Sequence, residues 1–161
     1  MIANPGALAP IIREMRQVDV PRVAIIEREA YEFPWSAGIF RDCLLAGYTS
    51  LIMEYRGDII AYAIMSVAAG EAHLLNLCVT RKFRRAGHGR RLLDVVLERA
   101  AQSGADEIHL EVRPSNSAAI DLYLLAGFQR IGVRKRYYRA SSGNEDAVLF
   151  ARSVNGRRLR E

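Results

Sequence analysis

Three segments early in the chain have the short, strongly apolar pattern that is typical of β-strands. They are TSLIMEY at residues 49–55, IIAYAIMSV at 59–67 and EAHLLNLCV at 71–79. The RGD between the first two is a tight-turn sequence, and no helix pattern separates any of the three. We therefore expect these strands to form an antiparallel meander.

The rest of the chain alternates between strand and helix patterns. Further strands are expected at residues 11–15, 107–112, 128–138 and 146–154. Helices are expected at residues 19–31, 36–45 and 117–125, and in a segment that ends at Gly104. Asp19 and Ser36 are suitable N-cap residues, and Gly47 and Gly104 are suitable stops. In the helix that ends at Gly104, one face carries Leu92, Leu93, Val96, Leu97 and Ala100.

This order of elements predicts a mixed α/β (α+β) fold, with a central, largely antiparallel sheet flanked by about four helices. With 161 residues the chain has the length of one domain that buries a core. Half of the residues are hydrophobic and a quarter are charged, which is typical of a soluble globular protein. We expect a single domain over residues 1–161, with flexible ends at 1–10 and 155–161.

Positive charge is concentrated in two places along the chain, whose net charge is +5. Arg157, Arg158 and Arg160 form a basic C-terminal tail, and six Lys and Arg residues lie within residues 81–91 with no acid among them. A basic balance indicates an anionic cofactor, nucleic acid or a ribosomal setting, and does not choose among them.

Cysteine and histidine usage argues against disulfides and metals. Cys43 and Cys78 form no disulfide framework and lie in apolar patterns, so we expect small buried hydrophobes in a reducing compartment. The three histidines are not spaced as a zinc site, and no metal is expected. The N-terminus lacks a secretory-signal pattern, and no apolar run approaches the length of a membrane span. We expect a cytoplasmic protein without membrane association.

The basic segment TRKFRRAGHGRR at residues 80–91 places Gly87 and Gly89 where a helix begins. A strand that enters a Gly-rich turn opening a helix presents free backbone N–H groups and the positive end of the helix dipole, and both suit a phosphate. A Rossmann fingerprint would need a small residue at Leu92, and a Walker A loop would need Gly-Lys-Ser/Thr. A solvated basic loop remains the simpler alternative.

The remaining arrangement, Arg84-x-x-Gly87-x-Gly89, resembles the acetyl-CoA pyrophosphate loop of the GNAT N-acetyltransferase superfamily. Other segments resemble its RimI-type branch: FPWS at 33–36, EAHLLNLCV at 71–79, LEVRPSNSAAIDLYLLAGF at 110–128, RYY at 136–138 and EDA at 145–147. The resemblance covers residues 11–154. It implies an enzyme that acetylates the N-terminal alanine of a small-subunit ribosomal protein, with acetyl-CoA as cosubstrate.

The resemblance also implies which residues bind acetyl-CoA. They are Arg84, Arg85, Ala86, Gly87, His88, Gly89 and Arg90 in the loop, Leu77, Cys78 and Val79 through their backbone, and Asn116. Asn116 precedes a helix and could simply cap it. His88 is expected to point to solvent. Cys78 is expected to serve through its backbone, because an acetyl-cysteine mechanism would need an activating base beside the thiol.

Acetyl transfer to an amine requires a free lone pair on nitrogen. At pH 7 about 10–20% of a peptide α-amine but only about 0.04% of a lysine side chain is neutral, a gap of about 3.5 kcal/mol. An α-amine therefore needs only a modest base, and the resemblance assigns Glu111 to that role. Alternation with His109 and Arg113 leaves open that Glu111 merely lies on a solvated sheet face. Glu71 and Glu32 are the other candidates for the base.

Tyr123 is assigned by the resemblance as the general acid. A phenol with a pKa near 10 can donate a proton to a departing thiolate. Its helical spacing from Ala119 and Gly127 is also typical of core packing, and this alternative stays open.

Two aromatic segments, YEFPWS and RKRYY, flank by resemblance the groove that takes the acceptor N-terminus. The substrate-binding candidates are Glu32, Trp35, Glu71, Tyr138 and Asp146. Trp35 precedes the Ser36 cap and could be only a hydrophobic staple.

Two other functional classes stay open. The first is a GNAT enzyme that acetylates protein lysines or a small-molecule amine. The second is a non-catalytic ribosome- or nucleic-acid-binding module that uses the basic segment. Phe83 is the single aromatic residue between Lys82 and Arg91, which disfavours a single-strand binding platform, so no direct nucleic-acid contact is required.

Overall fold

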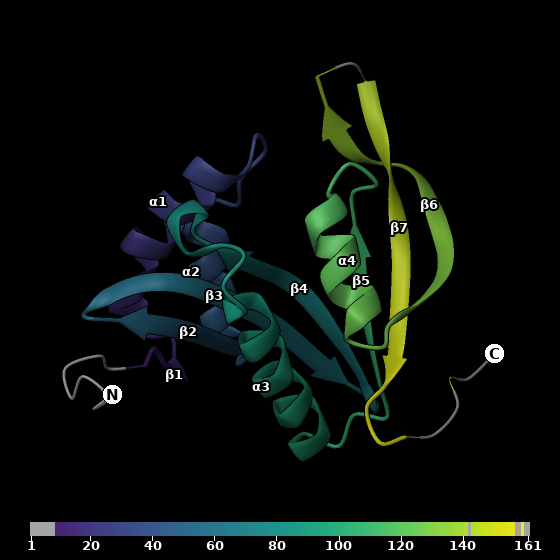
Figure 1. Cartoon of the computed structure of the whole chain (residues 1–161), viewed down its shortest axis with the longest axis horizontal. Coiled ribbons are helices and arrows are strands. Elements are labelled where there is room, and N and C mark those ends of the chain that lie inside the picture. The colour runs from purple at the N-terminus through teal and green to yellow at the C-terminus, as the bar shows by residue number, and fades with distance from the viewer. Residues whose placement is uncertain (1–8, 142, 157–158, 160–161) are drawn as a thin grey trace, which may run out of the picture. The chain divides into compact units, whose positions relative to one another are not determined.

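The structure, a computed structural model, describes residues 9–141, 143–156 and 159. Its strands are β1 (Ile11–Glu14), β2 (Thr49–Tyr55), β3 (Asp58–Ala68), β4 (Glu71–Val79), β5 (Glu107–Val112), β6 (Gln129–Ala140) and β7 (Gly143–Ser153). The strand order is β1-β2-β3-β4-β5-β7-β6 (Figure 1). The β1/β2, β5/β7 and β6/β7 pairs are antiparallel, whereas β4 and β5 are parallel. The predicted mixed α/β fold with a largely antiparallel sheet is confirmed.

Four α-helices lie between these strands in the described part of the chain. They are α1 (Val20–Ala30), α2 (Ala37–Leu45), α3 (His88–Gln102) and α4 (Ser117–Leu125). Two single 3₁₀ turns, Gln17–Asp19 and Arg81–Phe83, precede α1 and α3. None of the helices in the described ranges is long and apolar enough to cross a membrane.

Two short turns connect the strands of the predicted meander. Arg56 and Gly57 join β2 to β3, and Ala69 and Gly70 join β3 to β4. All four residues have positive φ, between 51° and 82°. A two-residue loop with both φ values positive is the type I′ connection, whose twist matches that of an antiparallel hairpin. The meander follows from these two turns.

The structure differs from the sequence-based expectations at several element ends. The β6–β7 hairpin is longer than predicted, because β6 continues to Ala140 and β7 begins at Gly143. Ser36 caps α2 as expected, with its hydroxyl accepting from the Ile39 N–H at 3.3 Å. Asp19 occupies the N-cap position of α1, but its side chain makes no capping bond. The expectation of flexible ends falls mostly on residues 1–8, 157–158 and 160–161, which lie outside the described residues.

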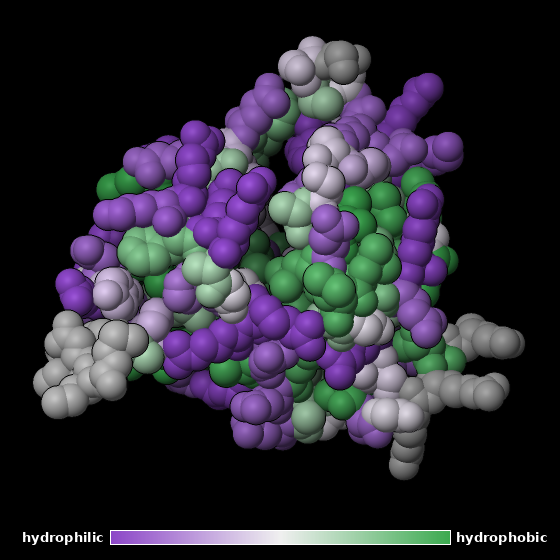
Figure 2. Space-filling view, viewed as in Figure 1, coloured by the Kyte–Doolittle hydropathy of each residue, from purple (hydrophilic) through white to green (hydrophobic). Residues whose placement is uncertain are grey.

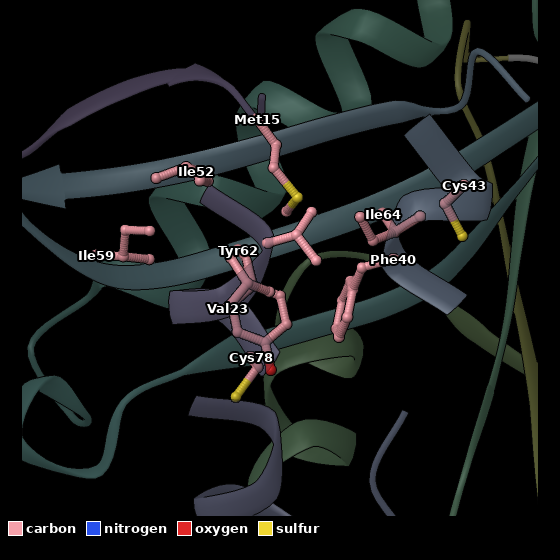
Figure 3. Close-up of a cluster of buried hydrophobic side chains, with 10 residues drawn as sticks. Met15, Val23, Phe40, Cys43, Ile52, Ile59, Tyr62, Ile64 and Cys78 are labelled. Atoms are coloured by element: carbon pink, nitrogen blue, oxygen red, sulfur yellow. The ribbon is translucent and has the colours of Figure 1, made fainter. Parts of the chain in front are cut away.

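The described chain divides into two compact units. The first comprises the residues up to Ile64 together with Leu77–Leu92, and the second comprises Met65–Asn76 and the chain from Leu93 onward. Figure 3 shows the core of the first unit, in which Phe40 and Tyr62 lie side by side with their ring centroids 5.6 Å apart. Both cysteines lie in this core, as expected for small buried hydrophobes.

A buried carboxylate ties three segments of the first unit together. Glu27 on α1 is only 2% exposed. One of its oxygens accepts from the Tyr62 hydroxyl on β3 at 2.7 Å, and the other accepts from the backbone N–H of Trp35 at 2.9 Å. A buried carboxylate is tolerated because it is hydrogen-bonded in this way. The segment between α1 and α2 is thereby held against the core.

A second buried carboxylate joins β1 to the start of α1. Both oxygens of Asp19 accept from the Arg13 guanidinium, at 2.8 and 2.9 Å, and one also accepts from the Arg16 N–H at 2.8 Å. Arg13 also bonds Glu54 on β2 at 2.7 Å. The bonds from Arg13 hold the pKa of Asp19 below its ordinary value.

In the second unit, α4 is anchored mainly by one aromatic residue. Tyr123 is the buried residue of this helix, and its ring packs on Phe128 with centroids 5.5 Å apart. Arg152 on β7 donates to the Ala126 carbonyl at the C-terminal end of α4, at 2.7 Å. Figure 2 shows hydrophobic residues gathered over α4, where Leu124 and Leu125 are 51% and 80% exposed.

The Asp19–Arg13 junction predicts a pH-dependent contribution to stability. Asp19→Asn should lower the free energy of unfolding at pH 7 by about 1–3 kcal/mol, because it removes a charged, nearly buried hydrogen-bonding partner. Since the folded-state pKa of Asp19 is depressed, this contribution is present above its unfolded pKa and is lost as pH falls through the folded pKa. Urea unfolding at pH 7 and pH 3 measures it. Asp121→Asn, the same change on the exposed side of α4, is the control, and an equal loss in both variants at pH 7 would contradict the assignment.

Candidate active site

The glycine loop of the first unit ends where α3 begins. The Arg91 N–H donates to the Gly87 carbonyl at 3.1 Å, which is the first bond of the helix, and α3 starts at His88 as expected. The N–H groups of the first turn have no partner within the helix and point out of its positive end. Gly87 has φ +82°, and a Cβ built there meets nothing within 4 Å. The backbone at Gly87 is therefore open to the approach of a ligand.

Arginines surround this loop, and two of them fold it against its neighbours. The Arg84 Nε donates to the Val79 carbonyl at 2.9 Å, and Arg91 donates to the Pro10 carbonyl at 2.6 Å. Arg85 is exposed and has φ +60°. A pocket of about 240 Å³ opens beside the loop and is lined by Ile26, Glu29, Ala30, Thr80, Arg81 and Arg84. The loop therefore combines oriented N–H groups with a cationic field.

His88 does not point freely into solvent, and that expectation was wrong. Its ring lies against the edge of Phe83, with centroids 6.0 Å apart, and the residue is half-buried. Phe83 in turn contacts Tyr55 at 5.8 Å. The His88 ring thus packs on the aromatic residue that precedes the loop, while its backbone N–H belongs to the first turn of α3.

The end of β4 supplies the backbone groups expected to meet the acetyl donor. The Leu77 carbonyl accepts from the Tyr31 hydroxyl at 3.4 Å, and the Val79 carbonyl accepts from Arg84. Cys78 is buried, and burial raises the pKa of its thiol. A buried thiol with a raised pKa is a poor nucleophile. The geometry supports a backbone role for Cys78 and disfavours an acetyl-cysteine intermediate.

In the second unit, Glu111 lies on β5 among cationic and phenolic side chains. Its side chain is 28% exposed, and Oε1 lies 3.2 Å from an Arg134 nitrogen on β6. The same Arg134 guanidinium lies 4.7 Å from the ring centroid of Tyr137. Burial, together with the nearby Glu111 carboxylate, raises the pKa of Tyr137. Glu111 is therefore not a freely solvated surface residue, but a half-buried carboxylate held by β6.

Tyr138 interacts electrostatically with both candidate catalytic residues, Glu111 and Tyr123. Burial and the negative charge of Glu111 raise the pKa of Tyr138 to about 12. Its ring lies under the Arg113 guanidinium, 4.5 Å from the ring centroid. Tyr138 also contributes to the raised pKa of Tyr123.

The core-packing interpretation of Tyr123 is confirmed, and its role as the general acid stays a prediction. Tyr123 is the buried anchor of α4, as core packing requires, and burial raises the pKa of its phenol. At neutral pH this hydroxyl therefore holds its proton. A phenol that stays protonated can serve as a proton donor.

Asn116 is the N-cap of α4. Its Oδ1 accepts from the Ala119 N–H at 3.2 Å. The capping interpretation is confirmed, and the expected contact with CoA remains a prediction.

Glu71 is engaged in a polar cluster some distance along the sheet from Glu111. It lies 3.1 Å from His73 and 3.4 Å from His109, whose rings stack with centroids 5.6 Å apart. The register places Glu71 opposite Glu107, four residues before Glu111, which corresponds to about 13 Å along the strand. Among the described residues, no three His, Cys, Asp or Glu side chains are arranged to hold a metal ion.

The other acceptor candidates differ in their surroundings. Glu32 is exposed between α1 and α2. Trp35 packs on Phe40 at 5.3 Å and is anchored through Glu27, so it belongs partly to the core. The Asp146 carboxylate accepts from the Arg136 N–H at 2.9 Å and thus has an internal partner.

Sequence reasoning missed Arg134, which contacts Glu111, and Tyr137, which lies against Arg134. Both lie in the quoted RKRYY segment, but a regular strand places residues three apart on opposite faces. An irregular pairing of β6 with β7 between Arg134 and Tyr138 breaks this alternation. No signal in the sequence indicates that irregularity.

Comparison with known proteins extends over most of the chain. A profile of the acetyltransferase (GNAT) family matches residues 14–128. The ribosomal protein bS18-alanine N-acetyltransferase of Escherichia coli K12 is 35% identical over 144 residues, which cover 89% of this chain and 97% of that protein. The enzyme of the same name from Haemophilus ducreyi is 35% identical over 142 residues, covering 88% and 98%.

Solved structures show the same fold. The crystal structure of the ribosomal-protein-S18-alanine N-acetyltransferase from Escherichia coli has a TM-score of 0.85 and 34% identity, covering 95% of this chain and all of that one. Ard1 from Thermoplasma volcanium has a TM-score of 0.82 and 25% identity, covering 91% and 99%. The putative acetyltransferase yncA from Salmonella typhimurium, at 16% identity and a TM-score of 0.79, was solved with its cofactor acetyl-CoA. With more than half of its length matched by the family profile, the chain belongs to the acetyltransferase (GNAT) family of acetyl-CoA-dependent enzymes.

Proposed function

We propose that this enzyme transfers the acetyl group of acetyl-CoA to the N-terminal α-amine of a small-subunit ribosomal protein, chiefly to alanine. The observation that carries this proposal is the similarity, over nearly the whole of both chains, to bS18-alanine N-acetyltransferases. The acceptor is then a ribosomal protein in the cytoplasm. Neither a metal nor a direct nucleic-acid contact is part of the reaction.

The loop from Arg84 to Arg90 holds the pyrophosphate of acetyl-CoA in this proposal. The first-turn N–H groups of α3 donate to the phosphate oxygens, and Arg84, Arg85 and Arg90 neutralise their charge. The end of β4 and Asn116 bind the rest of the CoA chain. The positive φ and open front of Gly87 support this role, because they let a ligand approach the backbone.

Transfer proceeds by direct attack of the amine. Its nitrogen lone pair forms the C–N bond at the thioester carbonyl carbon, Glu111 accepts the proton that the nitrogen loses, and the C–S bond breaks. Tyr123 donates its proton to the departing thiolate and is reprotonated from solvent. The contact from Arg134, which itself lies against the Tyr137 ring, holds the Glu111 carboxylate and supports its role. The Tyr123 phenol holds its proton at neutral pH, as a general acid must, while burial, which raises its pKa, makes it a weaker acid than a free phenol.

Acetylation of a protein lysine or a small amine is the second candidate. A single half-buried carboxylate favours the α-amine, because about 10–20% of it is already neutral at pH 7 whereas lysine is almost wholly protonated. The negative charge of Glu111 acts on Tyr138 and helps to raise its pKa, and this interaction supports a role for Tyr138 in contacting the acceptor. Glu32 and Glu71 remain candidates for contacts with a positively charged acceptor chain.

The loop assignment predicts the behaviour of Gly87→Val. A β-branched residue is strained at φ +82° and places a side chain in the open space that Gly87 leaves beside the loop backbone, so acetyl-CoA affinity should fall at least about tenfold. Isothermal titration calorimetry measures the change. Gly57→Val is a matched control, because Gly57 has the same φ in the β2–β3 turn and equally open surroundings. Equal acetyl-CoA affinities in the two variants would show that the loop does not bind the pyrophosphate.

The proton-transfer roles predict separable kinetic effects. Glu111→Gln should lower kcat by about 10²–10⁴-fold with acetyl-CoA affinity unchanged, because it removes only the base. Tyr123→Phe should also slow transfer while leaving the melting temperature nearly unchanged, since the ring that anchors α4 remains. Glu107→Gln is the control on the same strand. Wild-type kcat in either variant across the pH range would remove that residue from its role.

The acceptor proposal predicts a preference between two peptides. One peptide has a free N-terminal alanine, and the other has the same sequence with a blocked N-terminus and one internal lysine. Intact-mass analysis should show acetylation of the free α-amine, at least about tenfold faster, because more of it is neutral. Faster acetylation of the blocked peptide would favour the lysine alternative and leave the family assignment intact.

A further inference from the structure

The β6 strand contains a bulge directly beside Glu111. Arg134 pairs with Ala147 and Tyr138 with Glu145, so four steps along β6 are matched by two steps along β7. Within this bulge Arg136 has φ +53°. A non-glycine residue at positive φ is uncommon and strained, and it persists only where its surroundings hold it.

The group that holds this conformation is the Asp146 carboxylate. Asp146 lies on β7 between Glu145 and Ala147, the two residues that flank the bulge in the pairing. Its Oδ1 accepts from the backbone N–H of Arg136 at 2.9 Å, and its Oδ2 lies 3.9 Å from the Lys135 ammonium. The displaced backbone of β6 is therefore bonded to a β7 side chain at the point where the regular ladder is interrupted.

The bulge decides which side chains reach Glu111. In a regular strand, Arg134 and Tyr137 would point to opposite faces because they are three residues apart. In the structure Arg134 lies 3.2 Å from the Glu111 carboxylate, and its guanidinium also lies 4.7 Å from the centroid of the Tyr137 ring, so both side chains lie on the side of Glu111. Bulges beside active sites commonly re-aim side chains in this way.

We infer that Asp146 is a positioning residue, which holds the Arg136 bulge and thereby delivers Arg134 and Tyr137 to Glu111. This inference rests on the proposed role of Glu111 as the base. It replaces the expectation that Asp146 contacts the acceptor, because its Oδ1 is already bonded to the Arg136 N–H. Asp146 acts through β6 and touches no reacting atom.

Two pairs of variants test the inference on the full-length enzyme, with a peptide that carries a free N-terminal alanine. Asp146→Ala removes the acceptor of the Arg136 N–H, and kcat should fall roughly tenfold because the base loses its fixed geometry. Asp146→Asn keeps an oxygen that can accept this bond, and kcat should stay within about threefold of wild type. KM for the peptide and acetyl-CoA affinity should change little in either variant.

The second pair changes the backbone preference at position 136 and leaves Asp146 intact. Arg136→Gly accepts positive φ without strain, whereas Arg136→Val does not, and both remove the same charge. We expect kcat near wild type for Arg136→Gly and roughly tenfold lower for Arg136→Val. In the double variant, Arg136→Gly should restore most of the kcat that Asp146→Ala loses, because the bulge no longer depends on the carboxylate.

Three outcomes would overturn the inference. The first is equal kcat for Arg136→Gly and Arg136→Val, and the second is a kcat of Asp146→Ala that matches wild type. The third is an equal rise of peptide KM in Asp146→Ala and Asp146→Asn without rescue by Arg136→Gly, which indicates a direct charge contact with the acceptor. If Asp146→Ala does not fold, the Arg136 pair still decides. A fully active Glu111→Gln enzyme would instead remove the base assignment, whatever the Asp146 and Arg136 variants show.

Discussion

The placement of β7 between β5 and β6 is the constraint on which the surroundings of Glu111 depend. β7 pairs antiparallel with both neighbours, so a β7 residue that is paired on both sides lies between one residue of β5 and one residue of β6. Figure 1 shows β7 running between these two strands. The side chains of β6 can reach Glu111 on β5 only across this strand. The β6 bulge then determines which of them do so.

Carboxylates in the structure have two kinds of partner, backbone N–H groups and side chains. Asp19, Glu27, Glu145 and Asp146 each accept a hydrogen bond from a backbone N–H, of Arg16, Trp35, Ser115 and Arg136 respectively. These bonds satisfy donors in segments where regular secondary structure is interrupted, which is why the acids are stabilising although they are partly or wholly buried. The bond from Ser115 lowers the pKa of Glu145, as expected for a carboxylate that is hydrogen-bonded when charged. Glu111 differs, because its ion pair is with the side chain of Arg134, 3.2 Å away.

Adjacent residues of β7 organise two different segments near Glu111. Glu145 bonds Arg113 at 3.2 Å and the Ser115 N–H at 3.0 Å, and so fixes the segment between β5 and α4. Asp146 fixes the bulge on β6. Arg113 in turn covers the ring of Tyr138. The EDA sequence thus supports the surroundings of the candidate base from both sides, which single-residue roles in binding would not explain.

Most elements of the fold could be predicted because their signals are local. The apolar runs of β2, β4 and β5 and the caps of α2 and α4 depend on residues within a few positions of one another, and their ends match the expectations closely. The loop before α3 could equally be predicted from the sequence, since glycine at positive φ before a helix is a local feature. The candidate site on β5 could be predicted only in part. Its base was assigned by resemblance, whereas alternation left open a solvated sheet face.

The sequence by itself determined the strands, the helices, the family and the chemistry available at Gly87, Glu111 and Tyr123. Only the tertiary structure decided which side chains surround Glu111, because that depends on the pairing of β6 with β7 across a two-residue irregularity. Residues within such an irregularity do not follow the alternation of a regular strand, so periodicity cannot predict where the side chain of Tyr137 points. Within this irregularity the Arg136 N–H donates to the Asp146 carboxylate, and these residues are ten positions apart. Such a contact exists only once the hairpin has formed.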